Sequence, residues 1–191
     1  MEQQLPTLTL PVGFNKVLLH SCCAPCVCEI MEILKQSSID TTVFFYNPNI
    51  DTEDEYNTRK IENIEFANKL NIPFIDGDYD TERWKSSIAG YENEPERGKR
   101  CTICFEMRLA TAAKYAYDNN FKLFTSSLGI SRWKNFEQVT NCGVRAAKIF
   151  PGITYWDYNW RKKGGSDRME KISKRENFYR QNYCGCIYSK G

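Results

Sequence analysis

The chain has 191 residues, 41% of them hydrophobic, which is enough to bury one substantial core without disulfide bonds. Its nine cysteines are an odd number, which argues further against a small secreted disulfide scaffold, and the net charge of +2 does not by itself indicate a nucleic-acid-binding protein. Residues 1–12 lack the basic and apolar segments of a signal peptide, and no apolar run is long enough to predict a membrane span. We therefore expect a cytoplasmic protein, in which grouped cysteines bind metals or serve catalysis.

Short apolar segments of strand type alternate along the chain with amphipathic segments of helical spacing. This alternation predicts an α/β fold in which a parallel sheet is sandwiched by helices in a Rossmann-like arrangement. A polar segment at 76–99 interrupts the pattern and is expected to hold one short helix and a loop or lid that delivers Cys101. The predicted strands are 16–20, 42–46, 73–75, 122–126 and 153–155, and the predicted helices are 24–36, 53–70, 81–88, 102–119, 133–149 and 167–177.

No repeat or interdomain linker is visible, so the chain is expected to form a single domain, residues 1–191. Residues 1–15 are expected to be an N-terminal tail, and residues 156–191 a C-terminal extension that carries cysteines. In sheets of this type, ligands bind at the carboxyl ends of the strands. Polar or cysteine-containing segments follow the first four predicted strands, so we expect the functional residues to converge on that edge.

Eight of the nine cysteines fall into three groups, and the ninth, Cys142, is interpreted as a buried packing residue. Thiolates are the ligands that zinc and iron–sulfur clusters prefer. Grouped cysteines therefore indicate a metal or redox site. The groups are Cys22, Cys23, Cys26 and Cys28; Cys101 and Cys104; and Cys184 and Cys186.

Four thiolates complete a [4Fe–4S] cluster, and the most economical set pairs the first strand end with the loop-to-helix junction. That set is Cys22, Cys23, Cys101 and Cys104. A structural zinc held by the same four cysteines is the alternative. Iron is favoured if Cys26, Cys184 and Cys186 gather there too, because seven thiols exceed what one tetrahedral zinc ion uses.

The Cys184-Gly185-Cys186 turn has three interpretations. With Cys26 it binds a second metal, or it cycles between dithiol and disulfide, or its two cysteines only pack. A strand followed by Cys23-Ala24-Pro25-Cys26 and a helix is also typical of thioredoxin-like thiol-disulfide oxidoreductases. Such a protein needs neither Cys22 nor the two further pairs, and its sheet is mixed.

The only histidine, His20, ends the first predicted strand, and we interpret it as a hydrogen-bonded core residue rather than a ligand. Proton donors must then come from elsewhere. By position the candidates are Asp80, Tyr79 and Glu55, although Glu55 is better explained as a surface charge.

Charge is distributed unevenly, with acidic residues concentrated at 51–65 and basic residues mixed with aromatic ones in the C-terminal third. Such a mixture suits an RNA backbone with unstacked bases, although a solvated helical face with core aromatics explains it equally well. The residues expected to contact RNA are Trp160, Arg161, Lys162 and Arg180.

Several ordered motifs between about residues 16 and 189 resemble those of the cobalamin-independent epoxyqueuosine reductases of the QueH type. They are His20 to Cys26, Tyr46 to Ile50, Glu55-Tyr56 with Arg59, Arg100 to Cys104 with Arg108-Leu109, Thr125 to Ser131, and Tyr179 to Cys186.

The resemblance implies an enzyme that reduces the epoxide of epoxyqueuosine at the wobble position of tRNA to give queuosine. It implies a [4Fe–4S] cluster on Cys22, Cys23, Cys101 and Cys104, and a Cys184/Cys186 pair that is redox-active or holds a second, mononuclear iron. The partners would be the tRNA anticodon arm and an electron donor, without DNA or membrane. The fold would resemble the adenine-nucleotide alpha-hydrolase (HUP) group, with residues 21–26 in place of a phosphate loop, which argues against ATP use.

The predicted catalytic residues are Cys26, Asp80, Cys184 and Cys186. Two alternatives stay open besides the reductase: the thioredoxin-like oxidoreductase and a zinc-stabilised RNA-binding module without catalysis. Turnover of a modified tRNA separates the reductase from both.

Overall fold

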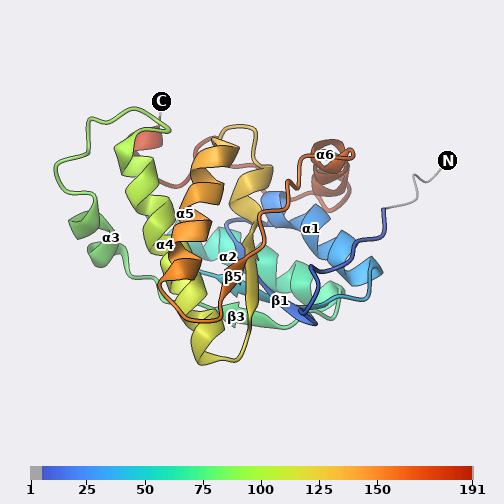
Figure 1. Ribbon diagram of the computed structural model, residues 1–191. Coiled ribbons are helices and arrows are strands. Elements are labelled where there is room, and N and C mark those ends of the chain that lie inside the picture. The colour runs from blue at the N-terminus through green and yellow to red at the C-terminus, as the bar shows by residue number, and fades with distance from the viewer. Residues whose placement is uncertain (1–5, 191) are drawn as a thin grey trace.

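The computed structural model describes residues 6–190 and contains one sheet of five parallel strands (Figure 1). The order across the sheet is β3-β2-β1-β4-β5. The central strand β1 is buried along almost its whole length, as is usual for strands covered on both faces. The strands are β1 (Lys16–Ser21), β2 (Asp40–Phe45), β3 (Phe74–Asp76), β4 (Leu123–Ser126) and β5 (Thr154–Tyr155). The predicted parallel α/β fold is therefore confirmed.

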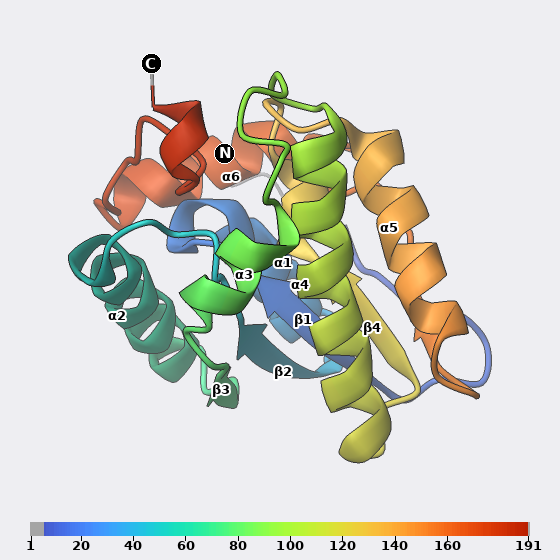
Figure 2. The same cartoon turned by 90° about the vertical axis from the view of Figure 1, so that its left-hand side faces the viewer.

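Within residues 6–190, six α-helices and two short 3₁₀ segments connect and cover these strands. Helices α1, α2 and α6 lie on one side of the sheet, and α4 and α5 lie on the other (Figures 1 and 2). The helices are α1 (Ala24–Gln36), α2 (Glu53–Lys69), α3 (Thr81–Ser87), α4 (Lys99–Asp118), α5 (Phe136–Lys148) and α6 (Gly165–Arg175), with η1 (Ser127–Ile130) and η2 (Ile187–Ser189). None of the helices within residues 6–190 combines the length and apolar character that crossing a membrane requires.

The two faces of the sheet form two separate cores, because successive side chains of a strand point to opposite sides. Val17 and Leu19 of β1 pack with α1, α2 and α6, whereas Leu18, between them, packs with α4 and α5. The sheet order reverses between β1 and β4, so the carboxyl ends of these two strands mark the topological switch point. This is the position at which open α/β sheets bind their ligands.

Helix α5 begins three residues later than the predicted 133, which corrects the interpretation of residues 133–135. The side chain of Asn135 accepts a hydrogen bond from the backbone N–H of Gln138 at 3.1 Å, so Asn135 is the N-cap. Trp133 and Lys134 consequently lie in a loop after η1 rather than in a helix.

The segment expected to be an N-terminal tail is packed against the core in its described part, residues 6–15. Leu8 is buried, and its backbone N–H donates to Oγ of Ser37 at 2.9 Å. Residues 1–5 lie outside the described part of the chain.

The C-terminal extension packs closely on the domain rather than standing apart from it. The hydroxyl of Thr125 in β4 donates to the carbonyl of Trp156 at 2.9 Å and accepts from the indole N–H of Trp160 at 3.3 Å. Helix α6 is joined to α1 by a buried ion pair between Arg168 and Glu29, 2.6 Å apart. From α6 the chain returns across the carboxyl edge of the sheet to its last described residues (Figure 2).

Candidate functional site

Three cysteines gather where β1 ends and α1 begins. Cys23 is the N-cap of α1 and its carbonyl accepts from the N–H of Cys26 at 3.1 Å, which folds the segment into a tight turn. The sulfur atoms of Cys22, Cys23 and Cys26 lie within 4.8 Å of one another, close enough to bind one metal centre. All three are free thiols.

Ser127, directly after β4, joins this group to the strand that neighbours β1 in the sheet. Its hydroxyl accepts from the backbone N–H of Cys22 at 3.1 Å and donates to the Cys22 sulfur at 3.3 Å. The Cys22 and Cys23 sulfurs are 3.8 Å apart. Hydrogen bonding from Cys23 places the pKa of Cys22 well below that of a free thiol, and the same bond raises the pKa of Cys23 to about 12. A thiolate at Cys22 is therefore stabilised by its immediate neighbours.

Cations from two helices and one loop lie near these thiols. Burial works to lower the pKa of Lys134, but the negative charges of Cys184, Cys22 and Cys26 raise it above the usual value. Arg59 of α2 is likewise raised in pKa by Cys23 against the effect of burial. Such a positive environment suits an anionic thiolate centre.

Arg108 of α4 is the third cation and is buried at 2% exposure. It donates to the side-chain oxygen of Asn47, which follows β2, and its charge acts on both Cys22 and Cys104. Its buried Nε has no hydrogen-bond partner among residues 6–190. The guanidinium of Arg108 is thus fixed at the site, and its Nε–H donor makes no hydrogen bond among the described residues.

The second cysteine pair lies in the first two turns of α4, which begins at Lys99. Cys101 packs against the same buried group as Cys22 and Cys23, whereas Cys104 packs with Trp84 and Cys186. Burial raises the pKa of both Cys101 and Cys104. The pair is therefore placed between the first and third cysteine groups, although neither sulfur belongs to the tight trio.

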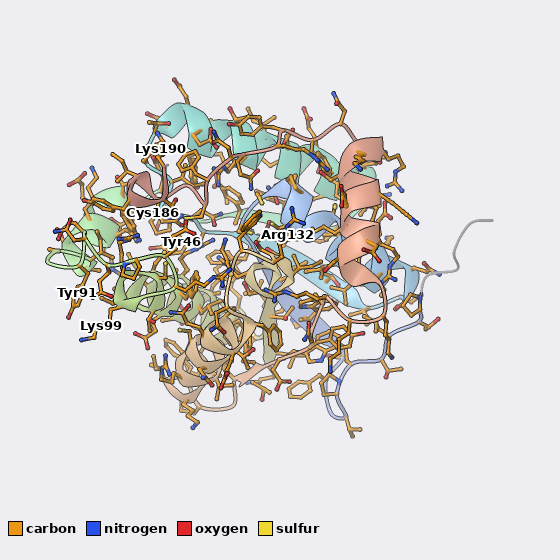
Figure 3. The ribbon with its side chains drawn as sticks, turned by 90° about the horizontal axis from the view of Figure 1, so that it is seen from above. Tyr46, Tyr91, Lys99, Arg132, Cys186 and Lys190 are labelled. Carbon is orange, nitrogen blue, oxygen red and sulfur yellow. The ribbon has the colours of Figure 1, made fainter. Side chains whose placement is uncertain are left out.

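The third group is docked on the loop that follows β2. Gly185 has a φ of +100°, and its carbonyl accepts a hydrogen bond from the backbone N–H of Asp51 at 3.0 Å. The side-chain amide of Asn49 donates a hydrogen bond to the carbonyl of Cys184 at 3.3 Å. Cys186 lies in the buried cluster at this edge, and Figure 3 shows it from above. Hydrogen bonding from Cys186 lowers the pKa of Cys184 well below its usual value.

Gln181 links the C-terminal extension directly to the first cysteine group. Its side-chain amide donates to the sulfur of Cys23 at 2.8 Å. Two residues further on, the hydroxyl of Tyr183 donates to Asp51 at 2.6 Å, and its carbonyl accepts from Arg59 at 3.3 Å. The three cysteine groups thus converge at one edge of the sheet, as the sequence predicted.

The sequence interpretations of His20 and Cys142 are confirmed. His20 is fully buried, with Nδ1 2.8 Å from the hydroxyl of Ser126 and Nε2 3.1 Å from the carbonyl of Tyr46. Burial lowers its pKa to about 3, so the ring is neutral. Cys142 is also fully buried, in the core under α4 and α5.

The three positional candidates for a proton donor have other partners in this structure. Asp80 is the N-cap of α3 and accepts from the N–H of Arg83 at 3.4 Å. Glu55 forms an ion pair with Arg59 at 2.6 Å. The hydroxyl of Tyr79 donates to the carbonyl of Ile50 at 2.7 Å.

The four residues predicted to contact RNA differ widely in exposure. Trp160 is only 2% exposed and belongs to the core, so its ring has no free face for a base. Arg161 is half-buried and donates to the carbonyl of Lys134 at 2.8 Å. Lys162 and Arg180 are exposed.

The sequence analysis did not identify Lys134 as a site residue, because the apolar spacing of residues 133–149 predicts a helix there. The position of Lys134 is a usable signal. It lies in the loop that follows β4 and η1, and ligand-binding residues are expected in loops after the carboxyl ends of central strands. Its companion Asn135 is a preferred N-cap residue, which marks the true start of α5.

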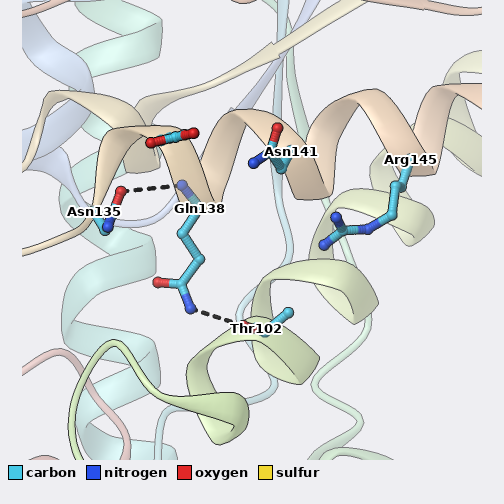
Figure 4. A pocket seen from close by; sticks show the side chains of 6 residues that line it. Thr102, Asn135, Gln138, Asn141 and Arg145 are labelled. Carbon is cyan, nitrogen blue, oxygen red and sulfur yellow. Dashed lines mark hydrogen bonds between the residues drawn. The ribbon is translucent and has the colours of Figure 1, made fainter.

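A hollow of about 390 Å³ opens between the first turns of α4 and α5 (Figure 4). Gln138 spans it, with its amide donating to the hydroxyl of Thr102 at 2.7 Å. The hollow is polar, and none of the cysteines lines it. We therefore treat the cysteine groups, and not this hollow, as the chemical centre.

Comparison with known proteins gives a consistent result. The family described as epoxyqueuosine reductase QueH matches residues 17–191. A protein of that name from Acinetobacter baylyi is 64% identical over 182 residues, which are 95% of this chain and 84% of that protein. One from Haemophilus influenzae is 59% identical over 182 residues, which are 95% of this chain and 74% of that protein. One from Thermotoga maritima is 32% identical over 176 residues, which are 91% of this chain and 89% of that protein. The chain therefore belongs to the epoxyqueuosine reductase QueH family.

Proposed function

We propose that this protein reduces the epoxide of epoxyqueuosine in tRNA to the alkene of queuosine. The reaction consumes two electrons and two protons, breaks both C–O bonds of the epoxide and releases its oxygen as water. The observation that carries the proposal is the convergence of three cysteine groups, among buried cations, at the switch point of a parallel sheet. The names of its relatives support the same activity.

The cofactor in this proposal is a [4Fe–4S] cluster held by Cys22, Cys23, Cys101 and Cys104. The donor set fits it, because free thiols are the ligands that such clusters use and neighbouring cations stabilise their thiolate forms. When bound, the cluster supplies electrons one at a time. Cys26, the third member of the tight trio, is left available beside it.

The role we propose for Cys184 and Cys186 is a change of state during turnover. Their proximity and the lowered pKa of Cys184 suit either a reversible disulfide or, with Cys26, the binding of a second iron. Arg59 and Lys134 balance the charge of the thiolates. Asp80, which follows β3 at the same edge, remains our proposed proton donor.

The proposed partners are the anticodon arm of tRNA and an electron donor in the cytoplasm. The exposed Lys162 and Arg180 offer positive charge to the RNA backbone, and Arg161 adds a further charge where it bonds to the carbonyl of Lys134. Trp160 is left out of this set because it is buried.

Anaerobic purification followed by a turnover assay tests the proposal. The protein should contain iron and sulfide in cluster proportions, absorb near 400 nm, and remove one oxygen atom from tRNA carrying epoxyqueuosine when a chemical reductant is supplied. Mass spectrometry of the released nucleoside measures this loss. Zinc without iron and without turnover would instead support the RNA-binding module, and reduction of a protein disulfide without action on tRNA would support the thioredoxin-like alternative.

A further inference from the structure

The loop between η1 and α5, residues 131–135, carries an unusually exposed aromatic side chain. Trp133 is 67% exposed, whereas the other tryptophans, Trp84, Trp156 and Trp160, are between 2% and 8% exposed. A tryptophan usually buries much of its ring, since large apolar surfaces are unfavourable in water. The ring of Trp133 is therefore accessible to a ligand.

The backbone beneath Trp133 is held firmly in place by bonds from two distant arginines. Nε of Arg97 donates to the carbonyl of Trp133 at 3.1 Å, and Arg161 donates to the carbonyls of Lys134 and Ser131. The N–H of Lys134 also donates to the carbonyl of Ser131 at 3.1 Å. Trp133 is thus an exposed ring on an ordered loop, which lowers the entropic cost of stacking a ligand on it.

The same loop begins beside the first cysteine group. Ser127, the first residue of the η1 segment that leads into the loop, hydrogen-bonds through its hydroxyl to the backbone N–H and the sulfur of Cys22 at 3.1 and 3.3 Å. Arg132, the residue before Trp133, lies at the carboxyl edge of the sheet near its centre when the molecule is seen from above (Figure 3). A ligand stacked on Trp133 would therefore lie beside the thiols.

Positive charge surrounds the ring. The guanidinium of Arg132 lies 5.0 Å from the ring centre of Trp133. Burial lowers the pKa of Arg161, and the charge of the nearby Arg97 lowers it further. The hydrogen bonds that both arginines donate here go to neutral backbone carbonyl groups. Two guanidinium groups that repel each other and face no carboxylate in these contacts form a suitable site for a phosphate.

Arg132 acts on one carboxylate, that of Glu170 in α6, which already has two basic partners. It pairs with Lys174 at 3.0 Å and lies 4.0 Å from Arg180, and Arg132 adds to their effect in lowering its pKa. None of Arg97, Arg132 and Arg161 belongs to an ion pair within residues 6–190. Their positive charges are therefore available to an anionic ligand.

We propose that Trp133 is a stacking platform for a base of the tRNA anticodon loop, and that Arg97, Arg132 and Arg161 bind the adjoining phosphates. Single-stranded RNA loops present unstacked bases and closely spaced phosphates, and proteins bind them with aromatic rings and guanidinium groups. This inference rests on the proposed function and assigns the substrate-binding surface of the same site. It places the anticodon loop over the cysteine groups through Lys134 and its neighbours.

The test measures binding of a synthetic anticodon stem-loop RNA to the anaerobically purified protein by fluorescence anisotropy. Trp133→Ala should weaken binding about tenfold, and Trp133→Phe, which keeps an aromatic face, should restore most of the affinity. Tyr117→Ala is the matched control: Tyr117 is 46% exposed near the C-terminal end of α4, remote from the cysteines, and its loss should leave the affinity unchanged.

Tryptophan emission gives a second readout, because Trp133 is the exposed indole. RNA should quench the emission of the wild-type protein and leave that of Trp133→Phe nearly unchanged, while iron content is the same in both. Equal RNA affinity of Trp133→Ala and the wild type would overturn the inference, as would absence of hairpin binding by the wild type. Turnover of epoxyqueuosine-containing tRNA, measured in parallel, shows separately whether the proposed function stands.

Discussion

At the scale of single residues, the cysteines of this site differ sharply in acidity although they are the same chemical group. In two of the three groups one thiol donates a hydrogen bond to its neighbour, which lowers the pKa of Cys22 and of Cys184 and raises that of Cys23 and of Cys186. Each of these groups therefore contains one cysteine whose thiolate form is favoured by its neighbour. A thiolate, and not a thiol, is the form that binds metal or attacks a disulfide.

The assignment of cluster ligands is tested by replacing one proposed ligand and one buried cysteine outside the set. Cys101→Ser should lose the visible absorbance and most of the iron, because serine is a poor ligand for the cluster. Cys142→Ser should keep both, since Cys142 lies in the core, where burial raises its pKa to about 11. Full iron content in Cys101→Ser would show that another thiol, with Cys26 the nearest candidate, completes the set.

His20 predicts a definite dependence of stability on pH. Its pKa falls from 6.5 in the unfolded chain to about 3 in the folded protein because burial disfavours the imidazolium. Between these values the unfolded state binds a proton that the folded state does not, so stability falls as the pH drops below 6.5, by up to about 1.4 kcal/mol per pH unit. Urea titrations should show this fall, and His20→Gln should show a shallower one. An equal pH dependence in the variant would contradict the prediction.

At the scale of elements, the 184–186 turn owes its position to glycine. Gly185 has φ +100°, and a Cβ there would lie 2.9 Å from Cγ1 of Ile50 and 3.2 Å from Nη1 of Arg59. Both the backbone conformation and the close approach exclude a side chain. The placement of Cys184 and Cys186 against the loop after β2 therefore depends on this one residue.

Gly185→Ala should displace the turn and abolish turnover, while the cluster and the core remain. The strained backbone alone costs about 1 to 2 kcal/mol, and the clash adds to it. Gly90→Ala is the matched control, because Gly90 also has positive φ, +84°, but a Cβ there meets nothing within 4 Å. The control should lose a similar amount of stability to backbone strain and keep its activity. Full activity in Gly185→Ala would show that the turn tolerates displacement.

Several elements could be predicted closely from the sequence because their signals are local. The predicted bounds of α1 match the structure, where Pro25 lies in the first turn and Cys23 caps the helix. The start of α5 could not be predicted from hydrophobic spacing alone, because Trp133 continues the apolar pattern and only the capping bond of Asn135 shows where the helix begins. The burial of Trp160 depends on its contact with Thr125, which no local pattern reveals.

At the scale of the whole molecule, the convergence of the cysteine groups was predictable and their detailed pairing was not. The carboxyl ends of parallel strands lie at the same edge of a sheet. Cys22 and the loops after the other strands therefore come together there, whatever the sequences of those loops. The tight trio of Cys22, Cys23 and Cys26, and the approach of Lys134, depend on side-chain packing between distant segments. Similarity to the adenine-nucleotide alpha-hydrolase fold stays a prediction.

The distribution of charge over the molecule predicts an RNA affinity that depends strongly on salt. Arg161→Ala combined with Lys162→Ala should weaken binding of the stem-loop RNA. The slope of the logarithm of the binding constant against the logarithm of the salt concentration should become less steep by about 1.4, because two phosphate contacts are lost. Lys122→Ala with Lys148→Ala removes the same charge from exposed positions at the opposite edge of the sheet and should leave both quantities unchanged. An equal effect in the two double variants would indicate attraction by net charge alone.

The bond between Ser127 and Cys22 joins residues that are 105 positions apart, and this separation has a consequence for how the protein is made. Because pairing of β1 with β4 closes a long loop, we expect it to be a late step in folding, and until it occurs the cysteine groups are separate and open to solvent. In that interval oxidation would join the wrong sulfurs before any metal binds. Refolding of the denatured chain should consequently succeed with an excess of reductant and fail in air, and cluster assembly should follow closure of the sheet rather than guide it.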